Sequence, residues 1–434
     1  MRALQLAAIG ILFSVCGPLL AAQSSRMSQV NGGANSCQWQ AAVAPDVVRS
    51  PVQMDIHAAY RIFAFQSGGT LGYTLRGQFP YAAFLSFTVY NGADALLHSA
   101  LLDYRIQPDD DSVNPFTEGE LVNARNRSYT VTLLPDGAVA NPSMPNPIFL
   151  PPPPRGSNVV TAVLVQRIYL AEPRVQDRFG GVEAPTIEPF ELSDPSTPAA
   201  CPSGDFSAIT AQFGSLGSNF SHSPLPRNGE IEFYRPPASQ VPYTDGSGPL
   251  GRHDCTGYLM ATVFPDQIAV IHFPTLPTFF DNTDTTRTTT FEITDVRYVS
   301  LGSYGASPLS ASENENIAGP DIKKLPDGSA TFVAIPIRLP SSLKEQVVAK
   351  AVQLGYNVMP LAEAGPVIKP FLTYRNKVAA PGFVGDIHNV PCYQGSSFDH
   401  APSADAASPA SMGPYAPHGI ECSPLDFLSR GCGQ

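Results

Sequence analysis

The sequence predicts an all-β protein of two tandem antiparallel β-sandwich domains, jelly-roll-like in form, with one short helix in the second. Three observations support this prediction. Short runs alternate apolar and polar residues, which is typical of half-buried strands. The 44 prolines and 35 glycines separate these runs at short intervals. The order of strands and turns in the first half also recurs in the second, and an internal repeat constrains the whole architecture.

Residues 37–200 are expected to form the first sandwich. Turn signals separate its apolar runs; Asn91–Gly92, for example, is a dipeptide typical of hairpin turns. The predicted strands include Leu71–Leu75, Leu85–Val89, Tyr129–Leu133 and Val159–Leu170.

Residues 205–434 are expected to form the second sandwich and a loop-rich C-terminal tail. The turn Leu325–Gly328 has the same Leu-Pro-Asp-Gly sequence as Leu134–Gly137, although it precedes its strand instead of following it. Prolines clustered at 194–206 predict a linker between the two domains. The predicted strands are Ile268–Phe273, Phe291–Leu301, Ala330–Ile337 and Val367–Tyr374.

A single helix is predicted in the second domain. Ser342 and Glu345 have the spacing of a capping box, and Gly355 supplies a stop. Apolar residues between them recur at helical spacing. We expect this helix to cover an open end of the second sandwich.

The first 22 residues predict a secretory signal peptide. Arg2 supplies a positive charge, an apolar run extends from Ala3 to Leu20, and the small pair Ala21–Ala22 follows. This order is that of a cleaved export signal. A membrane anchor and a lipoprotein signal at Cys16 are the alternatives, although the apolar run is short for a bilayer span. We expect a secreted or periplasmic protein without an integral membrane span after signal removal.

The composition limits the classes of partner. Hydrophobic residues make up 43% of the chain, which is enough for a packed core and unlike a disordered chain. The net charge is −11. Nucleic-acid binding needs clustered Lys and Arg, so we expect no nucleic-acid partner. The partner is expected to be an unidentified small molecule or protein.

Six cysteines follow the signal segment, and an even count in an exported chain predicts disulfides. Neither C-x-x-C spacing nor a Cys/His cluster is present, so no zinc site is predicted. The sequence does not choose among the possible pairings; our expectation joins Cys37 to Cys201 and Cys392 to Cys422. The six are Cys37, Cys201, Cys255, Cys392, Cys422 and Cys432.

Two segments in the first half carry a family resemblance. They read LRGQFPYAAFLSFTVYN and IQPDDDSVNPF, between Gly72 and Phe116. They resemble a group of exported bacterial proteins of unknown function, similar to the domain-of-unknown-function 1214 group with its jelly-roll-like sandwich. In the second half, Val296–Leu301 and Met412–Pro417 resemble a related set. The resemblance covers most of the mature chain and implies a fold but no activity.

One departure from that pattern selects candidate site residues. The pattern has Arg-Tyr where this chain has Ala83–Phe84, whereas the second copy keeps Arg297 and Tyr298. If the pair binds a ligand, only the second copy can do so. We therefore predict Arg297, Tyr298 and His272 as ligand-binding residues. The structural alternatives are an ion pair of Arg297 with Asp295 or another carboxylate, and a buried, hydrogen-bonded His272.

An enzyme is the competing hypothesis. Nucleophilic hydrolysis needs a Ser or Cys near a histidine that an acid orients. The chain has no G-x-S-x-G elbow. An exported hydrolase would therefore assemble its site only in the fold, with His272, His253 and Asp254 as first suspects. Three further histidines are expected in solvated loops of the tail: His388, His400 and His418.

Two groups of aspartates are candidate calcium sites. Asp109–Asp111 could hold calcium, as could Asp281 with Asp284. A turn in which each Asp bonds its own backbone is the alternative. No phosphate-cradling glycine loop follows a predicted strand, so no nucleotide cofactor is expected. The leading hypothesis is an exported ligand-binding or structural and interaction protein.

Overall fold

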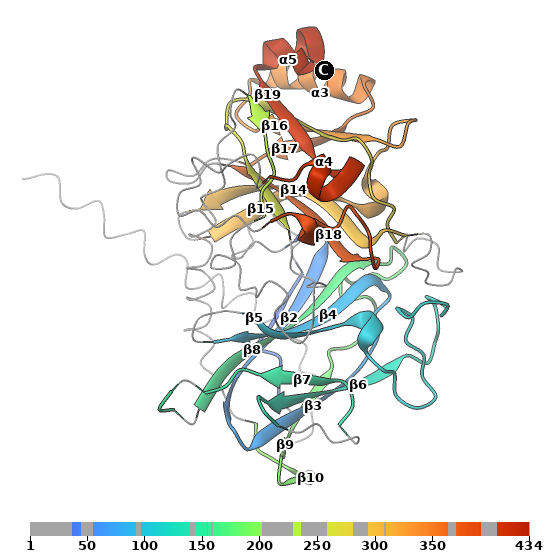
Figure 1. Cartoon of the computed structure of the whole chain (residues 1–434), viewed down its shortest axis with the longest axis vertical. Helices are drawn as coiled ribbons and strands as arrows, with labels where there is room; N and C mark the ends of the chain where they lie inside the picture. The colour runs from blue at the N-terminus through green and yellow to red at the C-terminus, as the bar shows by residue number, and fades with distance from the viewer. Residues whose placement is uncertain are drawn as a thin grey trace, which may run out of the picture.

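The structure is a computed structural model, and Figure 1 shows its course from the blue N-terminal sandwich to the orange and red C-terminal one. It describes residues 37–44, 55–92, 97–138, 144–153, 155–157, 159–201, 229–235, 258–280, 294–307, 310–362, 370–391 and 406–433.

The first sandwich consists, in this part of the chain, of two five-stranded sheets. One sheet has the strand order β1-β2-β8-β4-β5 and the other β10-β9-β3-β6-β7. All pairs are antiparallel except β6–β7. The strands are β1 Ala41–Val43, β2 Ala58–Gly68, β3 Leu71–Gln78, β4 Ala82–Asn91, β5 Leu97–Leu102, β6 Ser128–Pro135, β7 Pro147–Leu150, β8 Val159–Ala171, β9 Thr186–Glu191 and β10 Asp194–Pro198.

The second sandwich has the sheets β11-β19-β13-β16-β17 and β12-β18-β14-β15. The strands are β11 Glu230–Ile231, β12 Leu259–Thr262, β13 Ile268–Phe273, β14 Val296–Ser307, β15 Ser310–Ala318, β16 Ala330–Pro336, β17 Asn357–Leu361, β18 Phe371–Ala379 and β19 His418–Cys422. The short helical elements are η1 Asp103–Arg105, η2 Gly319–Asp321, α3 Ser341–Gln353, η3 Ile387–Asn389, α4 Pro409–Met412, η6 Gly413–Tyr415, α5 Pro424–Arg430 and η7 Gly431–Gly433. The all-β sandwich class is confirmed, although the second sandwich has more helix than the single one predicted.

The two sandwiches have the same topology. In one sheet, the strand order β2-β8-β4-β5 of the first sandwich corresponds to β12-β18-β14-β15 of the second. In the other sheet, the order β9-β3-β6-β7 corresponds to β19-β13-β16-β17. The one parallel pair recurs as well, β6–β7 in the first sandwich and β16–β17 in the second. The Leu-Pro-Asp-Gly turns do not correspond, because one follows β6 and the other precedes β16. The repeat is therefore one of topology more than of turn sequence.

A buried asparagine marks the same place in each copy. Asn146 exchanges hydrogen bonds with the backbone N–H and carbonyl of Gln107, at 2.7 and 2.8 Å, and donates to the carbonyl of Thr130 at 2.7 Å. Asn357 does the same with Lys323, at 2.8 and 2.9 Å, and with Thr331 at 3.1 Å. Each asparagine thus satisfies backbone groups that would otherwise be buried without partners.

Each sandwich holds its own apolar core between its sheets, and strand alternation explains how. On β13, Ala269, Ile271 and Phe273 point into the core between the two sheets. Ile268 and Val270 point to the outer face, where they pack in a separate cluster with residues of α3 and α5. Because successive side chains of a strand face opposite sides, one apolar run supplies both layers.

The helix α3 lies over the outer face of a sheet. The prediction that it covers an open end of the sandwich is therefore wrong. Val347 and Ala351 pack against Val333 and Ile335 of β16 in this outer cluster. Figure 1 places α3 and α5 at the end of the molecule opposite β10. Helix α3 covers this face because β16 and β17 are parallel. The chain between them must return from the end of β16 to the start of β17, and α3 forms this crossover.

The sequence predicts the C-terminal end of α3 correctly and its N-terminal end wrongly. Pro340 is the N-cap and no side chain caps the helix, so the capping box predicted at Ser342 and Glu345 is wrong. Gly355 does end the helix, with φ at +78°. Its N–H bonds the Val352 carbonyl, and the next N–H bonds Ala351, which is the Schellman pattern.

Two disulfides lie within the described residues. Cys37–Cys201 is confirmed, with Cα atoms 5.4 Å apart. Cys422 pairs with Cys432, so the predicted Cys392–Cys422 bond is wrong. The reason is local: α5 follows Cys422 and returns the chain to it, which brings the two Cα atoms to 5.5 Å. Cys255 and Cys392 lie outside the described residues.

The chain outside these elements bears on export. The predicted signal peptide, residues 1–22, lies outside the described residues. The linker predicted at 194–206 is wrong in its first part, because Asp194–Pro198 forms strand β10 of the first sandwich. Residues 202–206 lie outside the described residues. No helix in the part that the structure describes is long and apolar enough to cross a membrane.

The two disulfides are expected to stabilise the fold unequally. Replacing Cys37 and Cys201 by Ser should lower the free energy of unfolding by about 5 kcal/mol, because this bond closes the longer loop in the unfolded chain. Replacing Cys422 and Cys432 is the matched control and should cost about 3 kcal/mol. The sequence separations are 164 and 10 residues. Urea denaturation measures both losses, and a larger loss for the shorter loop would contradict the expectation.

Candidate functional site

Arg297 lies at the contact between the two sandwiches. Strand register equates it with Ala83, because Ser86 lies opposite Arg167 in the first copy and Ser300 opposite Arg375 in the second. Ala83–Phe84 of the first copy therefore corresponds to Arg297–Tyr298 of the second.

The side chain of Arg297 reaches the first sandwich. It is 1% exposed. Its guanidinium donates a hydrogen bond to the carbonyl of Phe116 and lies 5.5 Å from the centre of that ring and 5.7 Å from that of Phe280. Burial lowers the pKa of Arg297, and the charge of Asp103 opposes that shift. Asp295, the carboxylate expected beside Arg297, instead accepts hydrogen bonds from Thr278.

Asp103 is the acidic counterpart in the first sandwich. It is fully buried, and its two carboxylate oxygens accept hydrogen bonds from the N–H groups of Leu85 at 2.9 Å and Tyr104 at 2.6 Å. Burial raises the pKa of Asp103 to about 6, against the opposing effect of Arg297 and these two hydrogen bonds. The negative charge of Asp103 and the positive charge of Arg297 lie near enough to each other to influence both pKa values.

The family-like segment ending at Phe116 builds the first sandwich's side of this contact. Asn114 donates to the carbonyls of Asp103 at 2.7 Å and Ile106 at 2.8 Å, and accepts from the N–H of Phe116 at 2.9 Å. This loop lies between η1 and β6, where the second copy has only a short turn. Its motif therefore positions the carbonyl that Arg297 binds.

Tyr298 belongs to a second buried contact between the sandwiches, which we call the Asp55 network: Asp55, Tyr298, Asn316 and Arg375. The Tyr298 hydroxyl donates to Asp55 at 2.5 Å, and Asn316 donates to the other oxygen at 2.9 Å. Arg375 lies 3.4 Å from the same carboxylate. Asp55 precedes β2, whereas its three partners lie on β14, β15 and β18. All four side chains are at most 4% exposed.

Apolar and aromatic side chains surround this network. The rings of Tyr169 and Tyr298 pack edge to face, with centroids 4.9 Å apart. The cluster joins Phe84 and Val163 of the first copy to Val378 of the second. Sheet β1-β2-β8-β4-β5 thus packs on sheet β12-β18-β14-β15 (Figure 1). Arg297 and Tyr298 are held together at this contact, and both are buried by it.

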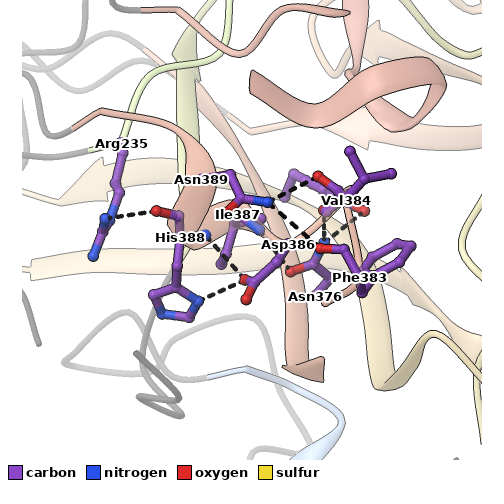
Figure 2. Close-up of polar contacts among 10 residues, drawn as sticks. Arg235, Asn376, Phe383, Val384, Asp386, Ile387, His388 and Asn389 are labelled. Carbon is purple, nitrogen blue, oxygen red and sulfur yellow. Dashed lines mark hydrogen bonds and ion pairs between the residues drawn. The ribbon is translucent and has the colours of Figure 1, made fainter. Parts of the chain in front are cut away.

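A histidine and a carboxylate meet in the loop after β18. Figure 2 shows His388 with its imidazole turned toward Asp386. One oxygen of Asp386 accepts from the backbone N–H of His388 at 3.0 Å and lies 2.6 Å from its Nδ1. An ionised carboxylate only accepts, so this hydrogen bond needs the proton on Nδ1.

Asparagines hold this loop in place. Asn376 of β18 donates to the carbonyl of Gly385 at 2.7 Å and accepts from Ile387 at 3.3 Å. Asn389 donates to the carbonyl of Val384 at 2.9 Å (Figure 2). Register equates Asn376 with Ile168 of the first copy, which lies in the apolar core. The hydrogen bonds between β18 and the loop that follows it therefore belong to the second copy.

The His388 site contradicts the expectation of a solvated tail loop. The His388 side chain is 8% exposed and that of Asp386 12%. Arg235, from the segment after β11, donates to the carbonyl of His388 at 3.4 Å. The signal in the sequence is the pair Asp-x-His, in which the acid caps a short turn and orients the ring.

His272 lies on a different sheet from the other two predicted ligand-binding residues. It is on β13, in the sheet opposite the one that contains Arg297 and Tyr298. Its neighbours on the adjacent strands are Thr331 and His418. His418 is thus a strand residue, which corrects its assignment to a tail loop.

The remaining sequence candidates assemble no site in the described residues. Asp109–Asp111 forms a turn, in which Asp111 has φ at +61° and the N–H of Ser112 bonds the Asp109 carbonyl. No group of three or more acidic, His or Cys side chains is placed to hold a metal in the described part of the chain. Five residues named in the sequence analysis lie outside it: His253, Asp254, Asp281, Asp284 and His400.

Comparisons with known proteins place the chain beside uncharacterised structures. No family model matches, and no curated protein does. The chain is similar to an uncharacterized protein from Burkholderia cenocepacia, with 12% identity over 88% of this chain and 81% of that one, and a TM-score of 0.46. The VPA0106 protein from Vibrio parahaemolyticus is 8% identical over 80% of this chain and 88% of that one, with a TM-score of 0.34. Neither likeness bears on function.

Asp103 is expected to make stability depend on pH. Its pKa in the folded protein is about 6, against 3.8 as the ordinary value. The folded state therefore holds this proton more tightly, so stability contributed by Asp103 is complete below pH 3.8 and is lost as pH rises through 6. The difference in unfolding free energy between wild type and Asp103→Asn should fall by about 3 kcal/mol from pH 4 to pH 7. Urea denaturation at several pH values measures this difference. A difference that does not change with pH would contradict the raised pKa of Asp103.

Proposed function

We propose that the chain is an exported binding protein in which two rigidly joined β-sandwiches present a polar ligand site around His388. The observation that carries the proposal is the Asp386–His388 pair, held by Asn376 in the loop after β18. The ligand is an unidentified small molecule or a group on a protein partner. Export is supported by the N-terminal pattern and by disulfides, which persist in oxidising compartments.

The contact between the sandwiches supports a fixed scaffold. The Asp55 network and the surrounding aromatic cluster fill the contact with buried side chains, so separating the copies would expose charges and apolar surface together. A ligand is then recognised by loops on a rigid support and not by closure of one domain on the other. Binding residues are commonly found on such loops.

The His388 loop is the favoured place because it differs between the copies. The two sandwiches share strand order and the buried asparagines, and those features serve the fold. The polar tie from Asn376 replaces a core isoleucine, Ile168, and thereby fixes a histidine at a sandwich end. The bond between Nδ1 and Asp386 holds the imidazole in one orientation, as a binding residue requires.

Hydrolysis is the second candidate, favoured by the same pair. A carboxylate that orients an imidazole is two thirds of a nucleophilic triad. A hydrolase would need a nucleophile beside this pair, either an activated water or a Ser or Cys side chain.

Native mass spectrometry of protein purified from the secreted or periplasmic fraction of its own host tests the proposal. Wild type should carry an added mass, and His388→Gln should lose it. Glu188→Gln, an exposed change in the first sandwich, should keep it. Wild type at the mass of the disulfide-bonded mature chain alone would contradict the proposal. Cleavage of p-nitrophenyl acetate that falls by about 100-fold in His388→Gln would establish the hydrolase instead.

A further inference from the structure

Two histidines lie side by side on the outer face of the second sandwich. His272 of β13 and His418 of β19 are direct cross-strand partners. Their ring centroids are 5.2 Å apart and the ring planes cross at 73°. His272 is half-buried and His418 is exposed. Both rings can therefore be reached from solvent, unlike the residues of the Asp55 network.

A third strand orients one of the rings. Thr331 of β16 lies opposite His272 on the side away from His418, and its hydroxyl is 3.0 Å from His272 Nδ1. A hydrogen bond to one ring nitrogen fixes the ring and leaves the other nitrogen as the ligand, which is the usual arrangement at protein metal sites. Thr331 thus has the place of a supporting residue.

A negative charge lies near His272. The pKa of His272 is lowered, because burial disfavours the charged ring and because His418 repels it. Asp327, in the turn before β16, opposes this shift through its negative charge. A carboxylate near the rings favours a bound cation.

The first sandwich provides an internal comparison. The positions of His272, His418 and Thr331 correspond to Arg76, Thr186 and Thr130, which have the same register. Arg76 lies 3.3 Å from the Thr130 hydroxyl and 3.8 Å from Glu188. The first copy therefore has an exposed ion pair where the second has two imidazoles, so the fold itself does not require histidine at these positions.

We propose that His272 and His418 together bind one divalent transition-metal ion, such as Zn²⁺, with water at the remaining positions. Two imidazoles on one tetrahedral ion, with Zn–N bonds of about 2.1 Å, have ring centroids roughly 5 Å apart, which is the separation observed. The exposed ring of His418 turns on a fast timescale to direct its nitrogen to the ion. This site is separate from that of His388 and does not rest on the proposed ligand.

Titration calorimetry of the full mature chain with Zn²⁺, without an affinity tag, tests the proposal. One ion per chain is expected, and His418→Gln should weaken its binding at least 10-fold. His98→Gln is the matched control, since it removes a histidine from the first sandwich, and should bind as wild type does. Cu²⁺ should bind more tightly than Zn²⁺ at the same site. Wild type that binds no ion, or His418→Gln that binds as wild type does, would overturn the proposal.

A second variant tests the geometry without removing either ligand. The double substitution Arg76→His and Thr186→His places two histidines at the equivalent positions of the first sandwich, opposite Thr130. If cross-strand register and the supporting threonine make the site, this variant should bind a second equivalent of Zn²⁺. Thermal melts show whether each variant is folded. A folded double variant that gains no ion would show that register does not make the site.

Discussion

Asp55 is the residue on which the arrangement of the two sandwiches depends. It is a fully buried carboxylate of the first copy, and its charge is compensated by Arg375 and by hydrogen bonds from Tyr298 and Asn316 of the second. An ion pair in such surroundings gains little over apolar packing, but the loss of one partner leaves a buried charge and costs several kcal/mol. The network therefore specifies how the copies meet more than it strengthens either one. The hydrogen bond from Arg297 to the carbonyl of Phe116 adds a second polar link at the same contact.

The repeat separates the residues that make the fold from those that make the second copy different. Asn146 and Asn357 bond the backbone of corresponding residues in the two copies, which marks a structural role. Three pairs of corresponding positions differ in chemistry: Ala83 and Arg297, Ile168 and Asn376, Arg76 and His272. The first difference joins the domains. The other two give the second copy a fixed loop histidine and a pair of surface histidines, and both proposed sites depend on them.

Sequence reasoning reached the all-β fold, the end of α3 at Gly355 and the equivalence of Ala83 with Arg297, because each depends on local pattern or on the repeat. The bond Cys37–Cys201 was expected because its cysteines flank the first domain, although the sequence did not exclude other pairings. It could not place Asp55 against Arg375, since residues 320 positions apart in the chain meet only through packing of the two copies. It also placed His388 in a solvated loop, because composition does not show that Asn376 ties that loop down. The Cys422–Cys432 bond depends on a reversal by α5 that spacing alone did not reveal.

Differential scanning calorimetry of wild type and Asp55→Asn tests most directly whether the buried network makes the two sandwiches one unit. Wild type should unfold in a single cooperative transition, with equal calorimetric and van't Hoff enthalpies. Asp55→Asn leaves Arg375 buried without its counter-charge, so its transition should move to lower temperature and separate into two. Glu188→Gln removes an exposed ion pair and should unfold as wild type does. Two independent transitions in wild type, or an unchanged single transition in Asp55→Asn, would contradict the account.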